Sequence, residues 1–174
     1  MAAIVQEYQR LIMEHADDEE IVQKFLEEKE KQVLWNFLAP SRIWKKPPIL
    51  VKYKADFAIL SRNRILYFIE LEKPATKLAK SRGGLHSELQ VGLDQIREWK
   101  KEVKDRREAV LYGLGLKQEE VHDIKFILVA GMAANTPIED LAILRSMNSD
   151  ADSIFCFDEL ASFLHSTETA LLNI

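Results

Sequence analysis

The chain has 174 residues, a length that fits one compact domain. Hydrophobic residues make up 47% and charged residues 30%, a globular balance that excludes a disordered or fibrous protein. No apolar run approaches the roughly 20 residues of a membrane-spanning helix, so we expect no membrane partner. Charges at Glu7 and Arg10 are unlike a signal peptide. The single cysteine, Cys156, allows no intrachain disulfide, which favours a reducing cytoplasm.

The net charge of −4 is unevenly distributed along the chain. Residues 1–40 carry 4 basic and 9 acidic side chains (net −5), residues 41–107 carry 17 and 8 (net +9), and residues 108–174 carry 3 and 11 (net −8). Phosphate backbones are bound by local potential rather than by whole-protein charge, so the middle third is a candidate nucleic-acid surface. Solvated helix faces of uneven composition would give the same pattern, and charge alone does not separate the two interpretations.

The first forty residues are predicted to be helical, with residues 1–20 as an N-terminal helical extension of the domain. Residues 17–20 place negative charge where a helix begins, and two apolar groups at helical spacing follow until Pro40. The segment 41–48 is predicted to be a basic loop that carries an aromatic residue, because its two adjacent prolines cannot lie inside a helix.

Short apolar runs then predict three strands, at residues 49–51, 57–60 and 65–71. The polar segment 61–64 joins the last two strands, which we expect to form a hairpin. Both faces of this hairpin are apolar, so the sheet should be covered on both sides.

A long helix is predicted from Ser87, where Ser87 and Gln90 have the spacing of a capping box. It follows Pro74 and a glycine-containing loop at residues 81–84. The apolar side of this helix consists of Leu89, Leu93, Ile96, Trp99 and Val103.

The C-terminal part is predicted to hold two strands, at residues 126–130 and 154–157, and two helices. The first of these strands is the most hydrophobic in the chain, so we place it centrally in the sheet. Thr136 and Glu139 have cap spacing for one helix, and the last helix is predicted from Asp158 through Leu164. The order α-β-β-β-α-β-α-β-α predicts an α/β fold with a central mixed sheet flanked by helices.

Three carboxylates stand at the ends of strands that are otherwise apolar. Asp56 opens one strand of the hairpin, and Glu70 and Glu72 close the other. Glu70 and Glu72 point to the same face, because side chains alternate along a strand. If residues 62–64 form a three-residue connection, Asp56 lies directly opposite Glu70, whereas a two-residue turn would place the two on opposite faces.

Like charges this close cannot all stay ionised unless a cation relieves their repulsion. A cluster of hard oxygen ligands suits Mg²⁺ or Mn²⁺ better than zinc. For a single carboxylate, a strand end that meets water is the favoured interpretation. For Asp56, Glu70 and Glu72 together, followed by Lys73, we favour a metal site.

The motifs and their order resemble a known superfamily. Residues 54–57 read Lys-Ala-Asp-Phe, residues 68–74 read Phe-Ile-Glu-Leu-Glu-Lys-Pro, and residues 95–99 read Gln-Ile-Arg-Glu-Trp. This pattern resembles the PD-(D/E)xK nuclease core, a restriction-endonuclease-like fold. More narrowly, it resembles the nuclease domain of Shedu-type antiphage defence proteins. The resemblance extends from about Phe25 to the segment around Phe157.

The resemblance implies metal-dependent hydrolysis of phosphodiester bonds in DNA of phage or other foreign origin. It also implies a defence role in a bacterial or archaeal cytoplasm, often as a homo-oligomer. In such a site Asp56 and Glu70 would bind Mg²⁺ or Mn²⁺ with help from the backbone carbonyl of Leu71. Gln95, on a helix that packs over the active site, would touch the catalytic cluster or the nearby backbone.

The chain departs from the family pattern where the usual lysine, two residues after the glutamate, is replaced by Glu72. Three interpretations stay open, in this order. Glu72 acts as metal ligand or base, Lys73 supplies the charge through a local distortion, or Lys54 takes over from the neighbouring segment. In a fourth, the site no longer cleaves, and the chain is a nucleic-acid-binding or regulatory pseudo-nuclease. A protein–protein scaffold would explain the acidic termini but not the carboxylates in strands.

Basic stretches border the expected site and are candidates for holding phosphates. These nucleic-acid-binding candidates are Arg42, Lys45, Lys46, Lys54, Lys77, Lys80 and Arg82. Trp44 is a candidate for base stacking, although a tryptophan that anchors a loop is the commoner case. His86 is an outside candidate for phosphate contact or proton transfer. Glu88, two turns before Gln95, is a candidate extension of the acidic site.

Overall fold

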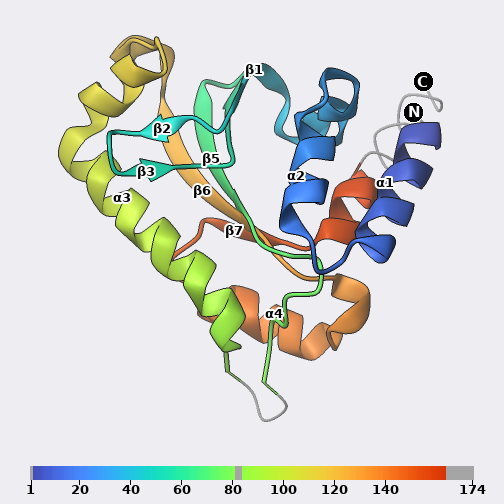
Figure 1. Ribbon diagram of the computed structural model, residues 1–174. Coiled ribbons are helices and arrows are strands. Elements are labelled where there is room, and N and C mark those ends of the chain that lie inside the picture. The colour runs from blue at the N-terminus through green and yellow to red at the C-terminus, as the bar shows by residue number, and fades with distance from the viewer. Residues whose placement is uncertain (1, 81–83, 164–174) are drawn as a thin grey trace.

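The computed structural model describes residues 2–80 and 84–163 of the chain. A five-stranded sheet of order β1-β4-β5-β6-β7 lies at its centre (Figure 1). The first three of these strands pair antiparallel, and β5, β6 and β7 pair parallel, so the sheet is mixed. The strands are β1 Pro40–Lys45, β4 Phe57–Ser61, β5 Ile65–Leu71, β6 Asp123–Val129 and β7 Ser153–Phe155.

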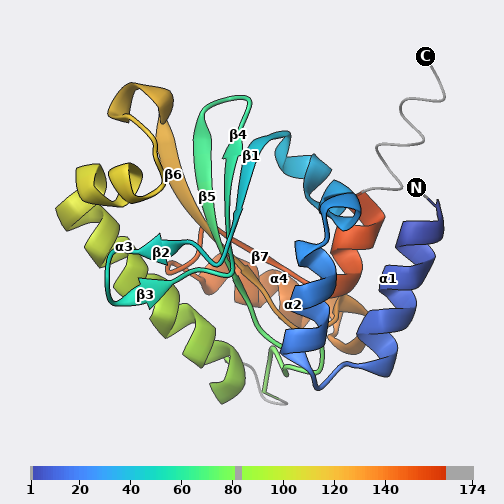
Figure 2. The ribbon, with the colours of Figure 1, turned by 45° about the horizontal axis from the view of Figure 1, so that its top comes forward.

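Helices cover both faces of the sheet (Figure 2). One face carries α1 (Ala2–Glu14), α2 (Glu19–Glu27) and the 3₁₀ helix η1 (Lys29–Leu38), and the other carries the long α3 (Ser87–Gly113). A small second sheet packs on α3. The remaining elements are β2 (Pro48–Ile49), β3 (Tyr53–Lys54), the 3₁₀ helices η2 (Gln118–Glu120) and η3 (Ala133–Asn135), and α4 (Ile138–Met147).

The sheet separates two buried apolar clusters. Alternate residues of β4 enter different clusters, so that Ala58 belongs to the cluster under α3 and Phe57 to the cluster under α1 and α2. Trp99 of α3 and Trp35 of η1 are fully buried, one in each cluster. Coverage of the hairpin on both faces is therefore confirmed, and burial of this apolar surface is the main stabilising contribution to the fold.

The predicted fold class is confirmed: the chain forms a mixed α/β core of the restriction-endonuclease-like kind. The strand predicted at residues 126–130 is β6, which has a parallel neighbour on each side. All five predicted apolar residues of α3 are buried. The first helix packs on the same domain, since the Tyr8 hydroxyl donates a hydrogen bond of 3.0 Å to the Phe157 carbonyl.

The prediction of a loop at residues 41–48 is wrong, because most of this segment is strand β1. It pairs antiparallel with β4 at the edge of the sheet, with Ile43 opposite Ile59. Pro40 stands at the first position of the strand, where a missing amide is tolerated. Charged side chains are common on edge strands because they face water, and they concealed the strand in the sequence.

The prediction of a strand at residues 49–51 is also wrong in extent. Only Ile49 belongs to a strand, β2, which pairs over two residues with β3. Leu50 has a φ of 58° and Val51 is fully exposed, so both belong to the turn between these short strands.

Two predicted helix caps differ from the structure. Helix α3 is capped by His86, whose Nδ1 accepts from the Glu88 amide at 3.4 Å, rather than by a capping box of Ser87 and Gln90. Helix α4 has no side-chain cap, because the Thr136 hydroxyl donates to the Met132 carbonyl instead. In both places the structure has a different hydrogen bond from the one that residue spacing predicted.

The C-terminal elements begin slightly earlier than predicted. Strand β7 ends at Phe155, and residues 157–163 are helical. Leu164, the predicted end of this helix, lies outside the described residues. Among the helices that the structure describes, none has the length and apolar character needed to cross a membrane.

Candidate active site

The β4–β5 hairpin positions the carboxylates. Phe57 pairs with Ile69, and three residues, 62–64, connect the two strands. Of the two connections that the sequence left open, the structure has the three-residue one and its register. One step beyond this pairing, Asp56 stands opposite Glu70, so the two carboxyl groups meet where β4 begins.

Neighbouring elements fix every polar group of Asp56. Its Oδ1 accepts a hydrogen bond of 2.5 Å from Nε2 of Gln23 on α2, and its Oδ2 accepts one of 2.8 Å from the Leu71 amide. Its amide donates to the Ile69 carbonyl at 3.1 Å, and its carbonyl accepts from the Lys46 amide at 2.8 Å. The Asp56 side chain thus accepts a hydrogen bond from the end of β5 at a position just before β4 begins.

Glu70 lies beside Asp56 with only 8% of its surface exposed. Burial raises the pKa of Glu70 to about 10, and the charges of Asp56, Glu72 and Glu19 add to the shift. Glu70 is therefore protonated at neutral pH and donates a side-chain hydrogen bond to Asp56. Burial also raises the pKa of Asp56, while the hydrogen bonds from the Leu71 amide and from Gln23 lower it.

Glu72 lies under helix α3. A Cβ atom on Gly92 would stand 2.8 Å from Oε1 of Glu72 and 2.8 Å from Cδ1 of Leu128, so the carboxylate fills the space that the glycine leaves. Burial raises the pKa of Glu72 to about 7, and the charges of Glu19 and Asp56 contribute. Glu72 therefore gains and loses a proton near neutral pH.

Helix α2 adds two side chains that the sequence patterns did not point to. Gln23 is 4% exposed and holds Asp56. Glu19 lies one turn earlier, and burial raises its pKa, followed by the charge of Asp56. A signal was present: Glu19 and Gln23 share a helix side with the apolar Val22 and Leu26, and a glutamine on an apolar side needs a buried partner.

Two lysines border the carboxylates. The positive charge of Lys73 lowers the pKa of Glu19 and Glu72, and that of Lys46 lowers the pKa of Glu19. Lys54 lies on β3 with an exposed side chain, and within residues 2–80 and 84–163 no hydrogen bond or ion pair joins it to the cluster. Of the three candidates for the role of the missing lysine, the structure brings Glu72 and Lys73 to the cluster.

Glu88 and Gln95 flank Gly92 by about one helical turn on either side. The charge of Glu88 raises the pKa of Glu72, and its Oε2 accepts a hydrogen bond of 3.0 Å from the Lys77 amide. Glu88 thus stands at the edge of the acidic cluster. Gln95 is half-buried, and in the described part of the chain it makes no hydrogen bond with a carboxylate, so its role stays a prediction.

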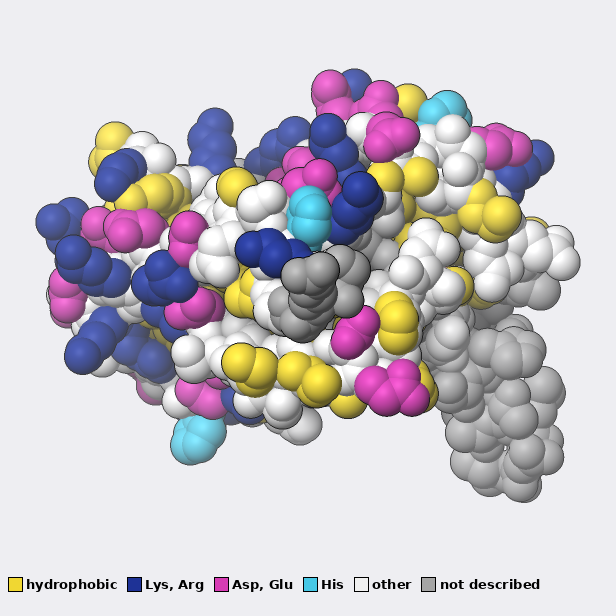
Figure 3. Space-filling model, turned by 90° about the horizontal axis from the view of Figure 1, so that it is seen from below, with side chains coloured by type: hydrophobic (Ala, Val, Ile, Leu, Met, Phe, Trp, Pro, Cys, Tyr) yellow, Lys and Arg dark blue, Asp and Glu magenta, His cyan; other side chains and the backbone are white. Residues whose placement is uncertain are grey.

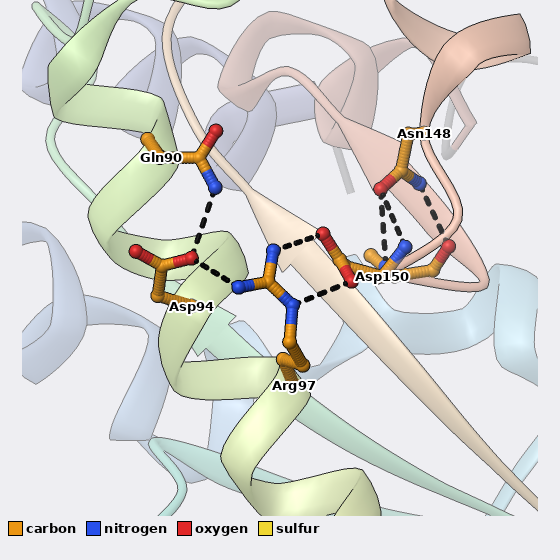
Figure 4. A network of polar contacts seen from close by, with 6 residues as sticks. Gln90, Asp94, Arg97, Asn148 and Asp150 are labelled. Atoms are coloured by element: carbon orange, nitrogen blue, oxygen red, sulfur yellow. Dashed lines mark hydrogen bonds and ion pairs between the residues drawn. The ribbon is translucent and has the colours of Figure 1, made fainter.

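An ion-pair network holds this part of α3 against the loop before β7 (Figure 4). The Arg97 guanidinium binds both carboxylate oxygens of Asp150, at 3.0 and 2.7 Å, and also Asp94 at 2.8 Å. Asn148 accepts from the Asp150 amide at 3.0 Å and orders the loop. The network braces the helix that carries Gly92 over Glu72.

The basic candidates near the cluster form two groups. Lys45 and Lys46 stand at the carboxylate end of the sheet, since Lys45 pairs with Phe57. Lys77 and Lys80 line a cavity that begins at Pro74. Figure 3 views this end of the molecule, where Lys and Arg side chains lie among Asp and Glu side chains.

The other basic candidates lie apart from the cluster. Arg42 forms an ion pair of 3.7 Å with Glu120 of η2, near the opposite end of the sheet. Its guanidinium lies 5.0 Å from the centre of the Trp44 ring, so one face of that ring is already covered. Arg82 lies outside the described residues.

Across residues 2–80 and 84–163, no three or more His, Cys, Asp and Glu side chains are arranged as a ready metal site. The carboxyl groups are engaged with one another, since Glu70 is protonated and bonded to Asp56. Their chemistry nevertheless fits a hard cation. Asp56, Glu70 and Glu72 offer oxygen ligands only, and a divalent ion would relieve the repulsion that keeps Glu70 protonated.

A mixed five-stranded sheet between helical layers is consistent with a restriction-endonuclease-like fold. The chain belongs to the family described as Shedu protein SduA, C-terminal, whose model matches residues 16–161. The match includes α2, the whole sheet and every carboxylate of the cluster, and α1 lies before it. The resemblance to Shedu proteins is thus confirmed, and membership associates the chain with antiphage defence. No curated protein matches the sequence significantly.

Proposed function

We propose that the chain is a metal-dependent nuclease that hydrolyses phosphodiester bonds in DNA during antiphage defence. The observation that carries this proposal is the gathering of Asp56, Glu70, Glu72 and Glu19 at one end of the hairpin. Four carboxyl groups with raised pKa values destabilise the fold, and such clusters are typical of functional sites. The basic residues beside them supply the complementary charge for a phosphate.

Asp56 and Glu70, with the backbone carbonyl of Leu71, would hold Mg²⁺ or Mn²⁺. Gln23 and the Leu71 amide already orient the Asp56 carboxylate. Glu70 would release its proton when it becomes a ligand. A bound ion supplies polarisation of a phosphoryl oxygen and a lower pKa for the attacking water.

Glu72 is the candidate general base. Its pKa of about 7 suits a group that accepts a proton at neutral pH. Lys73 remains beside it and is placed to stabilise negative charge on the phosphate. The family pattern has a lysine at the position of Glu72. In this arrangement Glu72 and Lys73 together would perform the role of that lysine.

A second candidate is a pseudo-nuclease that binds DNA without cutting it. Glu72 at the position of the usual lysine favours this reading, as does the hydrogen-bonded Asp56–Glu70 pair, which is not arranged for an ion. Such a protein would bind duplex DNA through its basic residues with strong salt dependence.

Plasmid cleavage tests the proposed function directly. Supercoiled plasmid is incubated with the wild-type chain in Mg²⁺ and in chelator, and nicked and linear products are quantified. Asp56→Asn and Glu70→Gln keep the size of the side chains but remove ligand charge. Glu108→Gln, an exposed position on the same helix as Gly92, is the matched control.

We expect cleavage by the wild type and Glu108→Gln only with the metal ion, and background cleavage by the two site variants. Cleavage in chelator, or undiminished cleavage by either site variant, would contradict the assignment. Salt-sensitive DNA binding without any cleavage by the wild type would establish the pseudo-nuclease instead.

A further inference from the structure

An open cavity of about 720 Å³ lies directly beyond the strand that ends in the carboxylates. Two stretches line it: residues 74–80 with His86 on one side, and residues 135–137 with Asp140 on the other. The cavity adjoins the carboxylate cluster. Glu88, which raises the pKa of Glu72, also accepts a hydrogen bond from the backbone of Lys77 in the cavity wall.

One wall of the cavity is basic. Lys77 and Lys80 have exposed side chains and form no ion pair within residues 2–80 and 84–163. The Nδ1 atom of His86 accepts from the Glu88 amide, which leaves Nε2 for another partner. Three cationic or hydrogen-bonding side chains therefore face one open space, as a phosphate site requires.

Thr76 adds a neutral polar group to the same wall of the cavity. It lines the cavity and is only 8% exposed. In the described part of the chain its hydroxyl makes no hydrogen bond. The hydroxyl is not one of the fully buried, unpaired polar atoms of the described residues, so it is open to the cavity, where a ligand oxygen can accept its hydrogen bond.

The opposite wall indicates more than a bare phosphate. It contains Asn135, Thr136 and Asp140, whose carboxylate would repel an inorganic anion. Asp140 and Asn135 instead suit a ligand that carries N–H or O–H donors as well as a phosphate. The volume also lies within the roughly 300–1,000 Å³ of small-molecule sites, which exceeds the need of a phosphate ion.

We propose that this cavity binds one nucleotide of the substrate strand, next to the phosphodiester at the carboxylate cluster. Lys77, Lys80 and His86 hold its phosphate, and Asn135 and Asp140 bind N–H donors of its base. The role in positioning DNA rests on the proposed function. Nucleotide binding itself requires neither a metal ion nor cleavage, so the two can be tested apart.

Nucleotide titration of the whole chain in chelator provides the test. Binding of thymidine 5′-monophosphate, thymidine and inorganic phosphate is measured by calorimetry or NMR shift changes. The double variant Lys77→Gln/Lys80→Gln and the single variant Thr76→Val alter the basic wall. Lys101→Gln/Lys104→Gln removes two exposed lysines of α3 outside this cavity and is the matched control.

We expect the wild type and the α3 control to bind the monophosphate more tightly than thymidine or inorganic phosphate. Loss of both cavity lysines should weaken this binding by about ten-fold or more, since a hydrogen bond to a charged group is worth at least this factor. Thr76→Val should weaken it less. Asp140→Asn should lower the preference for the monophosphate over inorganic phosphate.

Three results would overturn the inference: no monophosphate binding by the wild type, equal binding after loss of both cavity lysines, or inorganic phosphate binding as tightly as the nucleotide. Plasmid cleavage separates this inference from the proposed function. A chain that binds the monophosphate through Lys77 and Lys80 but never cleaves plasmid would keep the nucleotide site and reject the nuclease.

Discussion

Glu70 is protonated at neutral pH because the fold raises its pKa. Its ordinary pKa near 4.5 is raised to about 10 by burial and by neighbouring carboxylates. The unfolded chain releases this proton at a much lower pH than the folded chain does. The contribution of Glu70 to stability is thus fully present below about pH 4.5 and is lost as pH rises toward 10. At neutral pH the metal-free site destabilises the fold.

Glu70→Gln should therefore raise the stability of the metal-free protein, and the gain should grow with pH. The neutral amide fits a site that already prefers a neutral side chain. The slope difference can reach about 1.4 kcal/mol per pH unit. Urea unfolding of both proteins in chelator at pH 5.5, 7.0 and 8.5 measures it. Parallel stability profiles would show that Glu70 does not carry the shifted proton.

Gly92 is predicted to be essential for the position of Glu72. A Cβ atom there would stand 2.8 Å from both Glu72 Oε1 and Leu128 Cδ1. Gly92→Ala should lower the free energy of unfolding by about 1–3 kcal/mol, as overpacking does, and should reduce cleavage. Denaturant unfolding and plasmid cleavage measure the two effects.

Gly113→Ala on the same helix is the control for Gly92→Ala, since a Cβ atom at Gly113 would meet nothing within 4 Å. It should leave stability unchanged or raise it by up to about 1 kcal/mol. If Gly92→Ala behaved like this control, the close approach of α3 to Glu72 would be refuted.

At the scale of elements, the Arg97–Asp150 pair joins α3 to the loop before β7. A double-mutant cycle of Arg97→Met and Asp150→Asn should give a favourable coupling that falls with added salt. The pair is bidentate, with side-chain exposures of 55% and 23%. The Lys24–Glu20 pair, exposed at 68% and 69%, should couple more weakly. Equal coupling in both pairs would show that the network does not brace the helix.

Elements with strong local patterns could be predicted from the sequence. The β4–β5 hairpin could be predicted from two apolar runs and a short polar connection, but its register stayed open, because the sequence allowed a connection of two or three residues. Strand β1 could not be predicted in this way, because an edge strand buries little apolar surface and its charged side chains read as a loop. The predictions of the two helix caps were wrong because geometry, which the sequence does not show, decides between competing hydrogen-bond partners.

The candidate site, too, could be predicted only in part from the sequence. Asp56, Glu70 and Glu72 could be grouped because strand alternation and hairpin register place residues close together. Glu19 and Gln23 could not, because they reach the cluster from a helix whose docking on the sheet depends on tertiary packing. Sequence patterns thus identified the half of the site that lies within one supersecondary motif.

At the scale of the whole molecule, the net charge is small, but acidic and basic residues are segregated along the chain. In the sequence, the acidic first and last thirds flank a basic middle third. Two lysines of that middle third, Lys45 and Lys46, lie at the carboxylate end of the sheet. These two lysines supply positive potential where the proposed substrate binds.

Salt dependence of DNA binding tests this arrangement. In chelator, the slope of log affinity against log salt should decrease in magnitude by about 2 in Lys45→Gln/Lys46→Gln, because each phosphate contact contributes about 0.9. Lys101→Gln/Lys104→Gln should change this slope less, because these two lysines lie on α3 away from the carboxylate end of the sheet. A slope that is the same for the wild type and Lys45→Gln/Lys46→Gln would exclude Lys45 and Lys46 from DNA binding.

The proposed nuclease activity depends on whether the Asp56 and Glu70 oxygens bind a divalent ion. A crystal of the wild-type chain soaked in Mn²⁺ and measured at the manganese absorption edge tests this directly. We predict one anomalous peak about 2.0–2.3 Å from oxygens of both carboxylates, with the Asp56–Glu70 hydrogen bond broken. Strong manganese peaks elsewhere, with that hydrogen bond intact and no peak beside it, would contradict the metal site.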